Sequence, residues 1–266
     1  MGRVTTTDRR TALRAGATFV TAGALAAGCA THGAVAHPDP ATERPSPKAR
    51  ARARATSEAP VPRHFPTHPA QLTHGPRTHP RIALTFHGGG DPTTARALLA
   101  EAERHDAHVT VLAVGTWLDE HPALARRILD GGHDLGNHTL RHLDINTMSE
   151  AAAQAEITGC AERLQRLTGS IGTWFRPSRA ARASPLVERL AHTAGYPHVL
   201  SYDVDSLDFT SPGAGAVTRK VLGEIRNGSV VSLHFGYADT VAALPAVLEE
   251  LDRRGLRAVT TTELLS

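Results

Sequence analysis

From residue 81 to the end of the chain, short apolar segments alternate with longer amphipathic ones. The short segments have the length of buried strands, and the longer ones carry apolar residues at helical spacing. Such alternation is typical of parallel β-α-β units, in which a helix connects each strand to the next. We therefore expect an α/β domain of about seven parallel strands, either closed into a barrel or left as an open sheet.

The expected strands lie at 81–86, 109–114, 134–137, 173–175, 198–202, 229–234 and 256–259. The expected helices lie at 93–104, 120–130, 149–167, 184–194, 215–226 and 240–254. In parallel α/β proteins, chemistry gathers at the carboxyl ends of the strands. The polar residues that follow an expected strand are His87, His138, Arg176, Asp205 and His234. We expect these side chains to share one site.

Residues 1–36 have the pattern of an export signal. A basic segment that contains Arg9 and Arg10 precedes an apolar run over 15–27. That run is too short to span a bilayer, which takes about 20 apolar residues. The paired arginines resemble a twin-arginine signal, so we expect a protein that acts outside the cytoplasm.

The end of this segment offers two ways of maturation. Residues 25–29 resemble a lipobox, in which Cys29 would be lipid-modified after cleavage. Cleavage after Ala36, at a small-x-small sequence, is the alternative. The first predicts a lipid anchor in the membrane, and the second predicts secretion to the cell wall. Membrane association is expected only through such a signal or anchor.

Residues 37–80 are rich in Pro, Ala and Arg and have no apolar periodicity, which predicts an extended linker. The chain carries a formal net charge of +3, but its basic surplus lies before residue 81. The remaining domain, 81–266, is mildly acidic, which argues against nucleic acid as a partner. We thus expect three parts: a signal at 1–36, a linker at 37–80 and a domain at 81–266.

His138 and His142 give the strongest local indication of chemistry. Four residues apart, they would lie on one face of a helical turn and could bind one metal ion. Gly136 and Asn137, directly before them, favour a tight turn at the end of a strand. The pair predicts a divalent metal cofactor, and zinc suits imidazole ligands.

Five segments, taken in order, resemble the motifs of the polysaccharide deacetylases, the NodB-homology enzymes of carbohydrate esterase family four. They are residues 84–89, 132–142, 175–177, 205–209 and 230–234. The resemblance implies a distorted (β/α) barrel of about seven parallel strands. It also implies a metal-dependent hydrolase of a non-peptide C–N bond, which removes N-acetyl groups from a cell-envelope polysaccharide such as peptidoglycan or an N-acetylglucosamine polymer.

The resemblance assigns a role to each matching residue. His138 and His142 match the metal-binding histidines, and His234 matches the general acid. Arg176 matches the arginine that orients the general base. Asp205 matches the carboxylate that raises the pKa of the acid.

Two further positions, Phe209 and Leu233, match residues that contact the substrate in this family. The partner that the resemblance implies is therefore a cell-wall glycan. The sequence carries no indication of an oligomeric state.

The first motif departs from the family pattern. His87 stands where the general base Asp belongs, and Gly88 stands where a metal-binding Asp belongs. Asp91, in the following Gly-rich turn, could be the third ligand and leave His87 as the base, since an imidazole has a pKa of about 6.5. Alternatively, His87 could itself complete a three-histidine site. We favour Asp91 as the ligand and keep the second arrangement open.

The third motif departs as well, because residues 178–180 replace a Pro, an aromatic residue and a Gly of the family. A backbone N–H at this position can still stabilise an oxyanion. Arg179 would favour an anionic substrate. Two other functions stay open: a non-catalytic glycan-binding module of the same fold, and a hydrolase of small amides.

Overall fold

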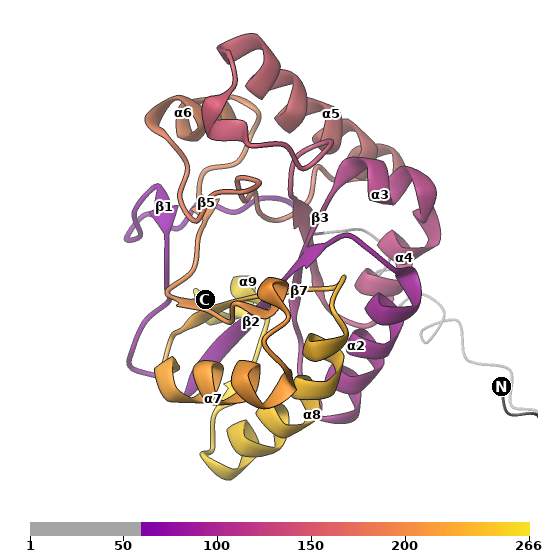
Figure 1. Ribbon diagram of the computed structural model, residues 1–266. Helices are drawn as coiled ribbons and strands as arrows, with labels where there is room; N and C mark the ends of the chain where they lie inside the picture. Colours follow the sequence, from indigo (N-terminus) through magenta and orange to yellow (C-terminus); the bar gives the residue numbers. More distant parts are fainter. Residues whose placement is uncertain (1–59) are drawn as a thin grey trace, which may run out of the picture. The chain divides into compact units, whose positions relative to one another are not determined.

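A computed structural model of the chain describes residues 60–266 (Figure 1). The expected signal over 1–36, with its arginine pair and Cys29, lies outside the described residues, and so does the linker as far as residue 59. Within the described range, no helix is long and apolar enough to cross a membrane.

A parallel sheet with the strand order β4-β3-β2-β7-β6 forms the centre of the fold. β8 pairs in parallel with the start of β2. The six strands are β2 (Arg81–Gly88), β3 (Thr110–Ala113), β4 (Asp134–Asn137), β6 (Val204–Asp205), β7 (Val230–His234) and β8 (Arg257–Ala258).

A second, short parallel pair closes the ring of strands. It consists of β1 (Gln71–Leu72) and β5 (Val199–Leu200). Phe175 bridges β4 on one side and β5 on the other. Because the chain continues from β5 into β6, which pairs with β7, the strands form a closed but irregular barrel. The prediction of a distorted (β/α) barrel is confirmed.

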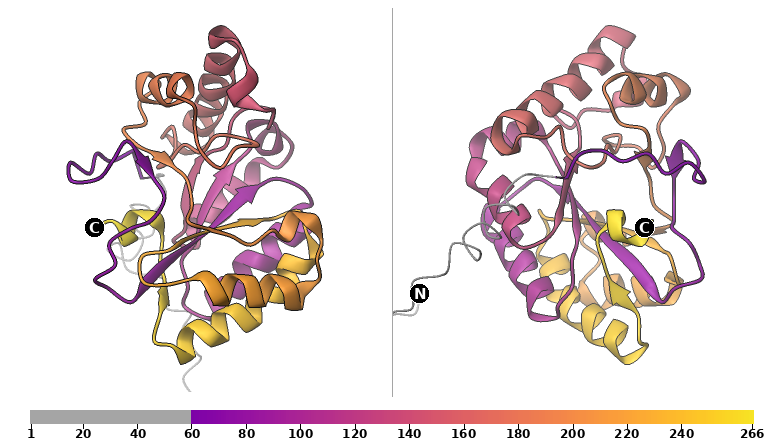
Figure 2. Two further views of the ribbon diagram at one scale, coloured as in Figure 1. Left: turned by 60° about the vertical axis from the view of Figure 1, so that its left-hand side comes forward. Right: turned by 180° about the vertical axis from the view of Figure 1, so that it is seen from behind.

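Helices cover the outside of this barrel (Figure 2). The six predicted helices each begin and end within two residues of their expected positions, while α3, α9 and the strands β1 and β6 were not predicted. The strand predicted at 173–175 is present only as bridges at Phe175. The helices are α2 (Pro92–Arg104), α3 (Gly115–Glu120), α4 (Pro122–Asp130), α5 (Glu150–Thr168), α6 (Pro185–Thr193), α7 (Ala214–Glu224), α8 (Ala238–Arg253) and α9 (Thr261–Leu264).

The side chains of β2 alternate between two apolar cores. Ile82, Leu84 and Phe86 pack outward against the helices, in the largest cluster of buried residues. Ala83 faces the barrel interior, in a cluster that contains Trp174. Because successive side chains of a strand point to opposite faces, the last inward position of β2 belongs to His87. The strand pattern thus aims one candidate site residue into the mouth of the barrel.

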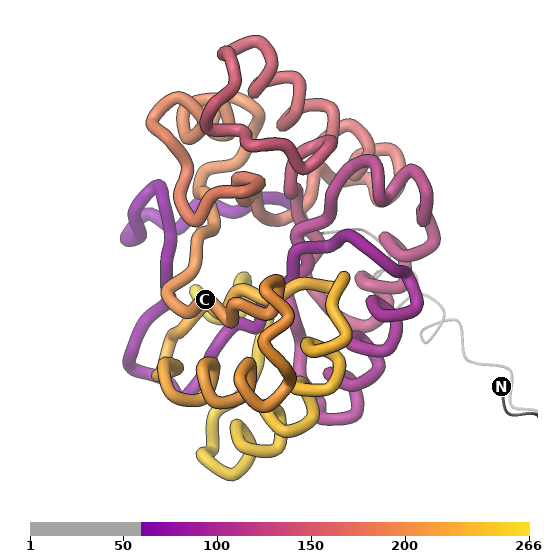
Figure 3. The backbone as a smooth tube through the Cα atoms, viewed as in Figure 1, coloured from indigo at the N-terminus to yellow at the C-terminus, as the bar shows by residue number. Residues whose placement is uncertain are grey.

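Residues 60–80, expected as linker, pack on the domain instead (Figure 3). Leu72 in β1 is 1% exposed, and the ring of Phe65 stacks on Trp174 with 5.8 Å between centroids. Arg77 forms an ion pair with Asp203 at 2.7 Å. Two isolated apolar residues among prolines give no periodicity, so the sequence pattern could not indicate this docking. The domain therefore begins before residue 81.

His133 makes the folded domain sensitive to acid. It is 3% exposed, and its Nδ1 accepts a hydrogen bond from the backbone N–H of Val109 at 3.1 Å. Burial lowers the pKa of His133 to about 4, against an opposing contribution from Glu103. The unfolded chain takes up this proton near pH 6.5, so stability is full above that pH and falls as the pH drops toward 4.

We predict that His133→Asn reduces this loss of stability, because an amide oxygen can accept the Val109 hydrogen bond but takes up no proton. A fall in pKa from 6.5 to about 4 corresponds to roughly 3 kcal/mol. Denaturant unfolding at pH 7 and pH 4 measures the difference. The exposed His192→Asn variant serves as the control and should lose as much stability as the unmodified protein. Equal losses in both variants would contradict the prediction.

Candidate metal-binding active site

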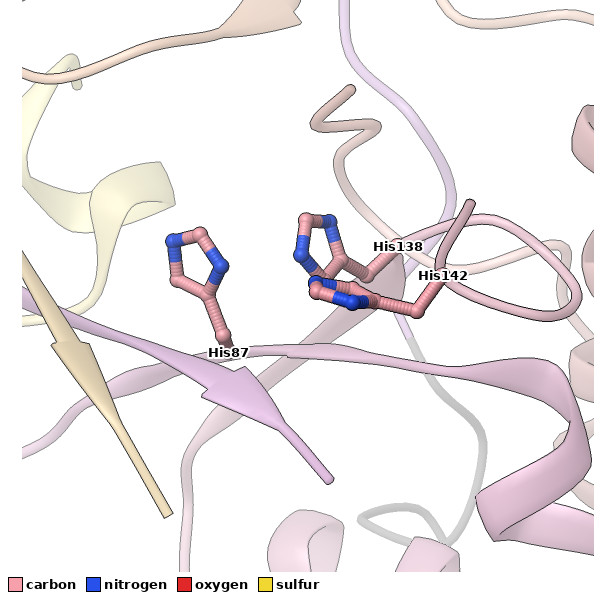
Figure 4. Close-up of side chains that lie close together, drawn as sticks. All are labelled: His87, His138 and His142. Carbon is pink, nitrogen blue, oxygen red and sulfur yellow. The ribbon is translucent and has the colours of Figure 1, made fainter. Parts of the chain in front are cut away.

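Three histidines converge at the mouth of the barrel (Figure 4). His87 comes from the end of β2, and His138 and His142 come from the loop after β4. One ring nitrogen of each lies within 4.8 Å of the others. The ring centroids of His87 and His138 are 4.4 Å apart, and those of His138 and His142 are 4.8 Å apart. Three imidazoles at this spacing can share one metal ion.

His138 is held in the tautomer that a metal ligand needs. Its Nδ1 lies 3.0 Å from the carbonyl oxygen of Arg176, which can only accept, so Nδ1 carries the proton. The lone pair of Nε2 is therefore free, and this buried atom has no hydrogen-bond partner. A second ring nitrogen bound to a backbone carbonyl is the usual support of a metal-binding histidine.

The loop that presents His142 is not the expected helical turn. Thr139 and His142 have φ values of 67° and 58°, in the left-handed region, so the two histidines meet through an irregular loop. The side chain of Asn137 fixes its start by accepting from the Thr139 N–H at 2.8 Å. Arg141 is held by Glu156 at 2.6 Å. The pairing of the histidines was predicted from the sequence, but the backbone that achieves it was not.

His87 offers an unpaired ring nitrogen from the opposite side. Its Nε2 lies 3.1 Å from the hydroxyl of Ser232, whereas its buried Nδ1 has no partner. Burial lowers the pKa of His87 well below its ordinary value, and neighbouring His138 and His234 lower it further. The imidazole is therefore neutral at neutral pH, with a lone pair available.

The residues present fit a divalent cation. The two unpaired atoms, Nδ1 of His87 and Nε2 of His138, are both buried, and an unsatisfied buried polar atom costs about 1–3 kcal/mol. Burial lowers the pKa of His138 well below its ordinary value and also lowers that of His142. Neutral imidazoles with unused lone pairs are what a metal ion such as zinc requires.

Asp91, the favoured third ligand in the sequence analysis, lies outside the histidine group. Its exposed carboxylate caps the start of α2 by accepting from the backbone N–H of Thr93 at 2.7 Å. Gly88 offers no site for a carboxylate either, because an added Cβ would lie 2.9 Å from Val111 and 3.0 Å from Ala113. The structure therefore brings His87, and not Asp91, together with His138 and His142.

Asp208, rather than the expected Asp205, is the partner of His234. Its Oδ1 lies 2.7 Å from His234 Nδ1, and its Oδ2 accepts from the backbone N–H of His234 at 2.8 Å and from the hydroxyl of Thr240 at 2.6 Å. Burial would raise the pKa of Asp208, but the hydrogen bonds from His234 and Thr240 leave it lowered overall. Asp205 instead accepts from the backbone N–H of Leu207 at 3.1 Å.

The sequence did contain both carboxylates of this segment. They lie three residues apart, and the pattern could not say which one faces β7. The left-handed backbone at Leu207, with φ 55°, turns the chain between them and decides the choice.

Arg176 is fully buried, and its backbone carbonyl oxygen lies 3.0 Å from Nδ1 of His138. Its Nε and Nη2 donate to the carbonyl oxygens of Leu200 and Ser201 at 3.0 and 3.1 Å, and its guanidinium lies 5.4 Å from the ring centroid of Tyr202. Burial lowers the pKa of Arg176 to about 10, so it stays charged at neutral pH.

An open cleft runs across the histidines in two lobes, which share His87, His142, His234 and Tyr237. One lobe, of about 530 Å³, extends toward Trp117 and Glu120. The other lobe, of about 520 Å³, is lined by Arg179, Tyr202, Asp205 and Phe209.

The two expected substrate contacts differ in their placement. Phe209 is 45% exposed and its ring centroid lies 5.5 Å from that of His234, so it stands in the cleft. Leu233 is 4% exposed and packs in the outer core. Strand alternation explains this correction: on β7, Ser232 and His234 face the site, and Leu233 between them faces the helices.

Comparisons with known proteins agree with this fold. Residues 74–199 match the family model described as polysaccharide deacetylase. A peptidoglycan-N-acetylglucosamine deacetylase of Bacillus cereus is 32% identical over 194 residues, which cover 71% of this chain and 90% of that protein. A relative of the same description from Listeria monocytogenes is 30% identical over 188 residues, 71% of this chain but 39% of that protein.

Among solved structures, a carbohydrate esterase family four pseudoenzyme from Bacillus anthracis superposes with a TM-score of 0.70 at 23% identity. The match covers 75% of this chain and 70% of that one. At this identity the likeness concerns the fold alone.

We predict that the protein binds about one zinc ion per chain and that His87→Ala weakens this binding more than about 100-fold, because changes around metal ligands already cost about 10–100-fold. Asp91→Asn is the matched control, since Asn also caps a helix. It should bind zinc as the unmodified protein does. Equilibrium dialysis with elemental analysis measures both. Loss of zinc in the Asp91 variant, with retention in the His87 variant, would assign Asp91 as the ligand instead.

Proposed function

The chain belongs to the polysaccharide deacetylase family, and from this we propose that it removes N-acetyl groups from a cell-envelope glycan in a metal-dependent hydrolysis. The observation that carries the proposal is the three-histidine group, which faces the hydrogen-bonded pair of His234 and Asp208 across one cleft. The relatives named as peptidoglycan-N-acetylglucosamine deacetylases support N-acetylglucosamine of peptidoglycan as the substrate.

His87, His138 and His142 would hold the metal ion. Three protein ligands and an open position are the usual arrangement of a catalytic zinc site. When bound, such an ion polarises the acetamide carbonyl and lowers the pKa of water. The open cleft of the two lobes leaves room for a sugar chain on either side of the three rings.

His234 is suited to protonate the leaving amine. Because Asp208 accepts a hydrogen bond at Nδ1, the other ring nitrogen of His234 is the one left to transfer a proton. Once water has added to the acetamide carbonyl carbon, the C–N bond breaks as the nitrogen receives this proton, which gives acetate and the free amine. The ionised Asp208 stabilises the imidazolium form before transfer. Asp205, at the wall of the same cleft, is left for contacts with the glycan or with Tyr202.

The place of action that fits this proposal is outside the cytoplasm. The signal-like residues 1–36 would direct export, and Cys29 would provide a lipid anchor if the lipobox is used. Cleavage without lipidation would release the protein to the cell wall, where the proposed glycan also occurs.

A second candidate is a glycan-binding module without catalysis. Positions 87 and 88 carry His and Gly, where the motif that they resemble has two carboxylates. This loss of the side-chain base favours the second candidate. If His87 holds the metal ion, it is not also free to act as that base.

We predict that the zinc-loaded protein releases acetate from peptidoglycan fragments and that His234→Ala lowers kcat by about 10²–10⁴-fold, the usual contribution of a general acid. Glycan binding should persist in this variant. An unchanged kcat for acetate release in this variant would show that His234 is not the general acid. If zinc-loaded protein released no acetate yet bound glycan in the presence of a chelator, the second candidate would be correct. Turnover of small amides alone would indicate a different hydrolase.

We further predict that Asp208→Asn lowers kcat more than Asp205→Asn does, because only Asp208 contacts the imidazole of His234. The amide in the first variant keeps the shape but no longer stabilises the charged ring. Parallel pH profiles of kcat for the two variants measure the effect. A larger loss in the Asp205 variant would restore the role that the sequence first suggested.

A further inference from the structure

The charged guanidinium of Arg176 has no anionic partner. Among the described residues, three side-chain nitrogens are buried without a hydrogen bond: His87 Nδ1, His138 Nε2 and Arg176 Nη1. A cation can bind the lone pairs of the two imidazole nitrogens. Nη1 is a donor on a positive group, so a cation repels it and cannot satisfy it.

The surroundings of Arg176 provide no ion-pair partner. Its backbone carbonyl oxygen lies 3.0 Å from His138 Nδ1, and its positive charge contributes to lowering the pKa of both His87 and His138. A divalent ion on the histidines would raise the positive charge further. In the described part of the chain, Arg176 forms no ion pair, and burying an ion without a partner is unfavourable.

The two nearby carboxylates do not neutralise it. The negative charge of Asp205 raises the pKa of Arg176, but Asp205 makes no ion pair with it. Its carboxylate accepts a hydrogen bond from the backbone N–H of Leu207 instead. Asp208 is engaged with His234 and Thr240. The carbonyl oxygens that receive the other guanidinium nitrogens are neutral.

We propose that Arg176 Nη1 binds a small carboxylate anion, of the size of formate or acetate, beside His87. Because no carboxylate of residues 60–266 forms an ion pair with Arg176, the anion would supply the missing negative partner. A carboxylate oxygen accepts a hydrogen bond from Nη1 and also neutralises the buried charge. A water molecule could accept the hydrogen bond but would not neutralise the charge.

Access limits the anion to a small one. Tyr202, whose ring centroid lies 5.4 Å from the guanidinium, lines the lobe of about 520 Å³ together with His87, while Nη1 itself is buried. A small anion suits a donor that is itself buried. The site is independent of the proposed reaction, although acetate would be both its product and a ligand of suitable size.

The test is the thermal stability of the metal-free protein in sodium formate and in sodium chloride at equal ionic strength. A ligand that binds the folded state raises Tm in a saturable manner. We expect this rise with formate but not with benzoate. His87→Asp supplies an internal carboxylate, and we expect it to weaken formate binding at least tenfold in a titration followed by the NMR signal of ¹³C-formate.

Arg179→Met is the matched control, because Arg179 is an exposed arginine of the same cleft, and it should keep the response to formate. The proposal fails if the unmodified protein shows no difference between formate and chloride, which would mean that water satisfies Nη1. It also fails if formate binds His87→Asp with unchanged affinity, or if the response disappears in the Arg179 variant.

Discussion

The parallel pairing of β2 with β7 is the constraint on which the site depends. It aligns His87 with His234, and it sets their rings 4.3 Å apart at the mouth of the barrel. β2 is also the strand that pairs with β3 and β8, so its inward face is fixed from both sides. A slip of one residue would turn His87 toward the helices and Phe86 into the cleft. The apolar residues of β2 that hold this register are therefore part of the functional design.

Burial is the main influence on the pKa values of His87, His138 and Arg176. The histidines are kept neutral by desolvation, which leaves lone pairs for a cation. Arg176 remains charged in the same environment and calls for an anion. The proposed cation and the proposed anion would together satisfy these buried groups.

The replacement of the two first-motif carboxylates is a coupled change. Gly88 has neighbours so close that no side chain fits without movement of β3, so a metal-binding residue cannot be restored there alone. His87 stands on the adjacent inward position and has a free nitrogen toward His138 and His142. In the proposed function the ligand would come from this neighbouring residue, and His87 would then not serve as the base. Asp208 and His234 are unaffected, because they lie on separate elements.

The sequence by itself determined the α/β alternation, the six helices, the histidine pair after β4 and the family. These depend on local periodicity and on motifs that are contiguous in the chain. Only the tertiary structure decided that His87 joins the pair, that Asp208 replaces Asp205 and that Leu233 faces the core. It also decided that residues 60–80 belong to the domain. Each of these depends either on contacts between segments far apart in the sequence or on a left-handed turn that the residue types do not specify. Distances between such segments cannot be read from the order of residues in one sequence.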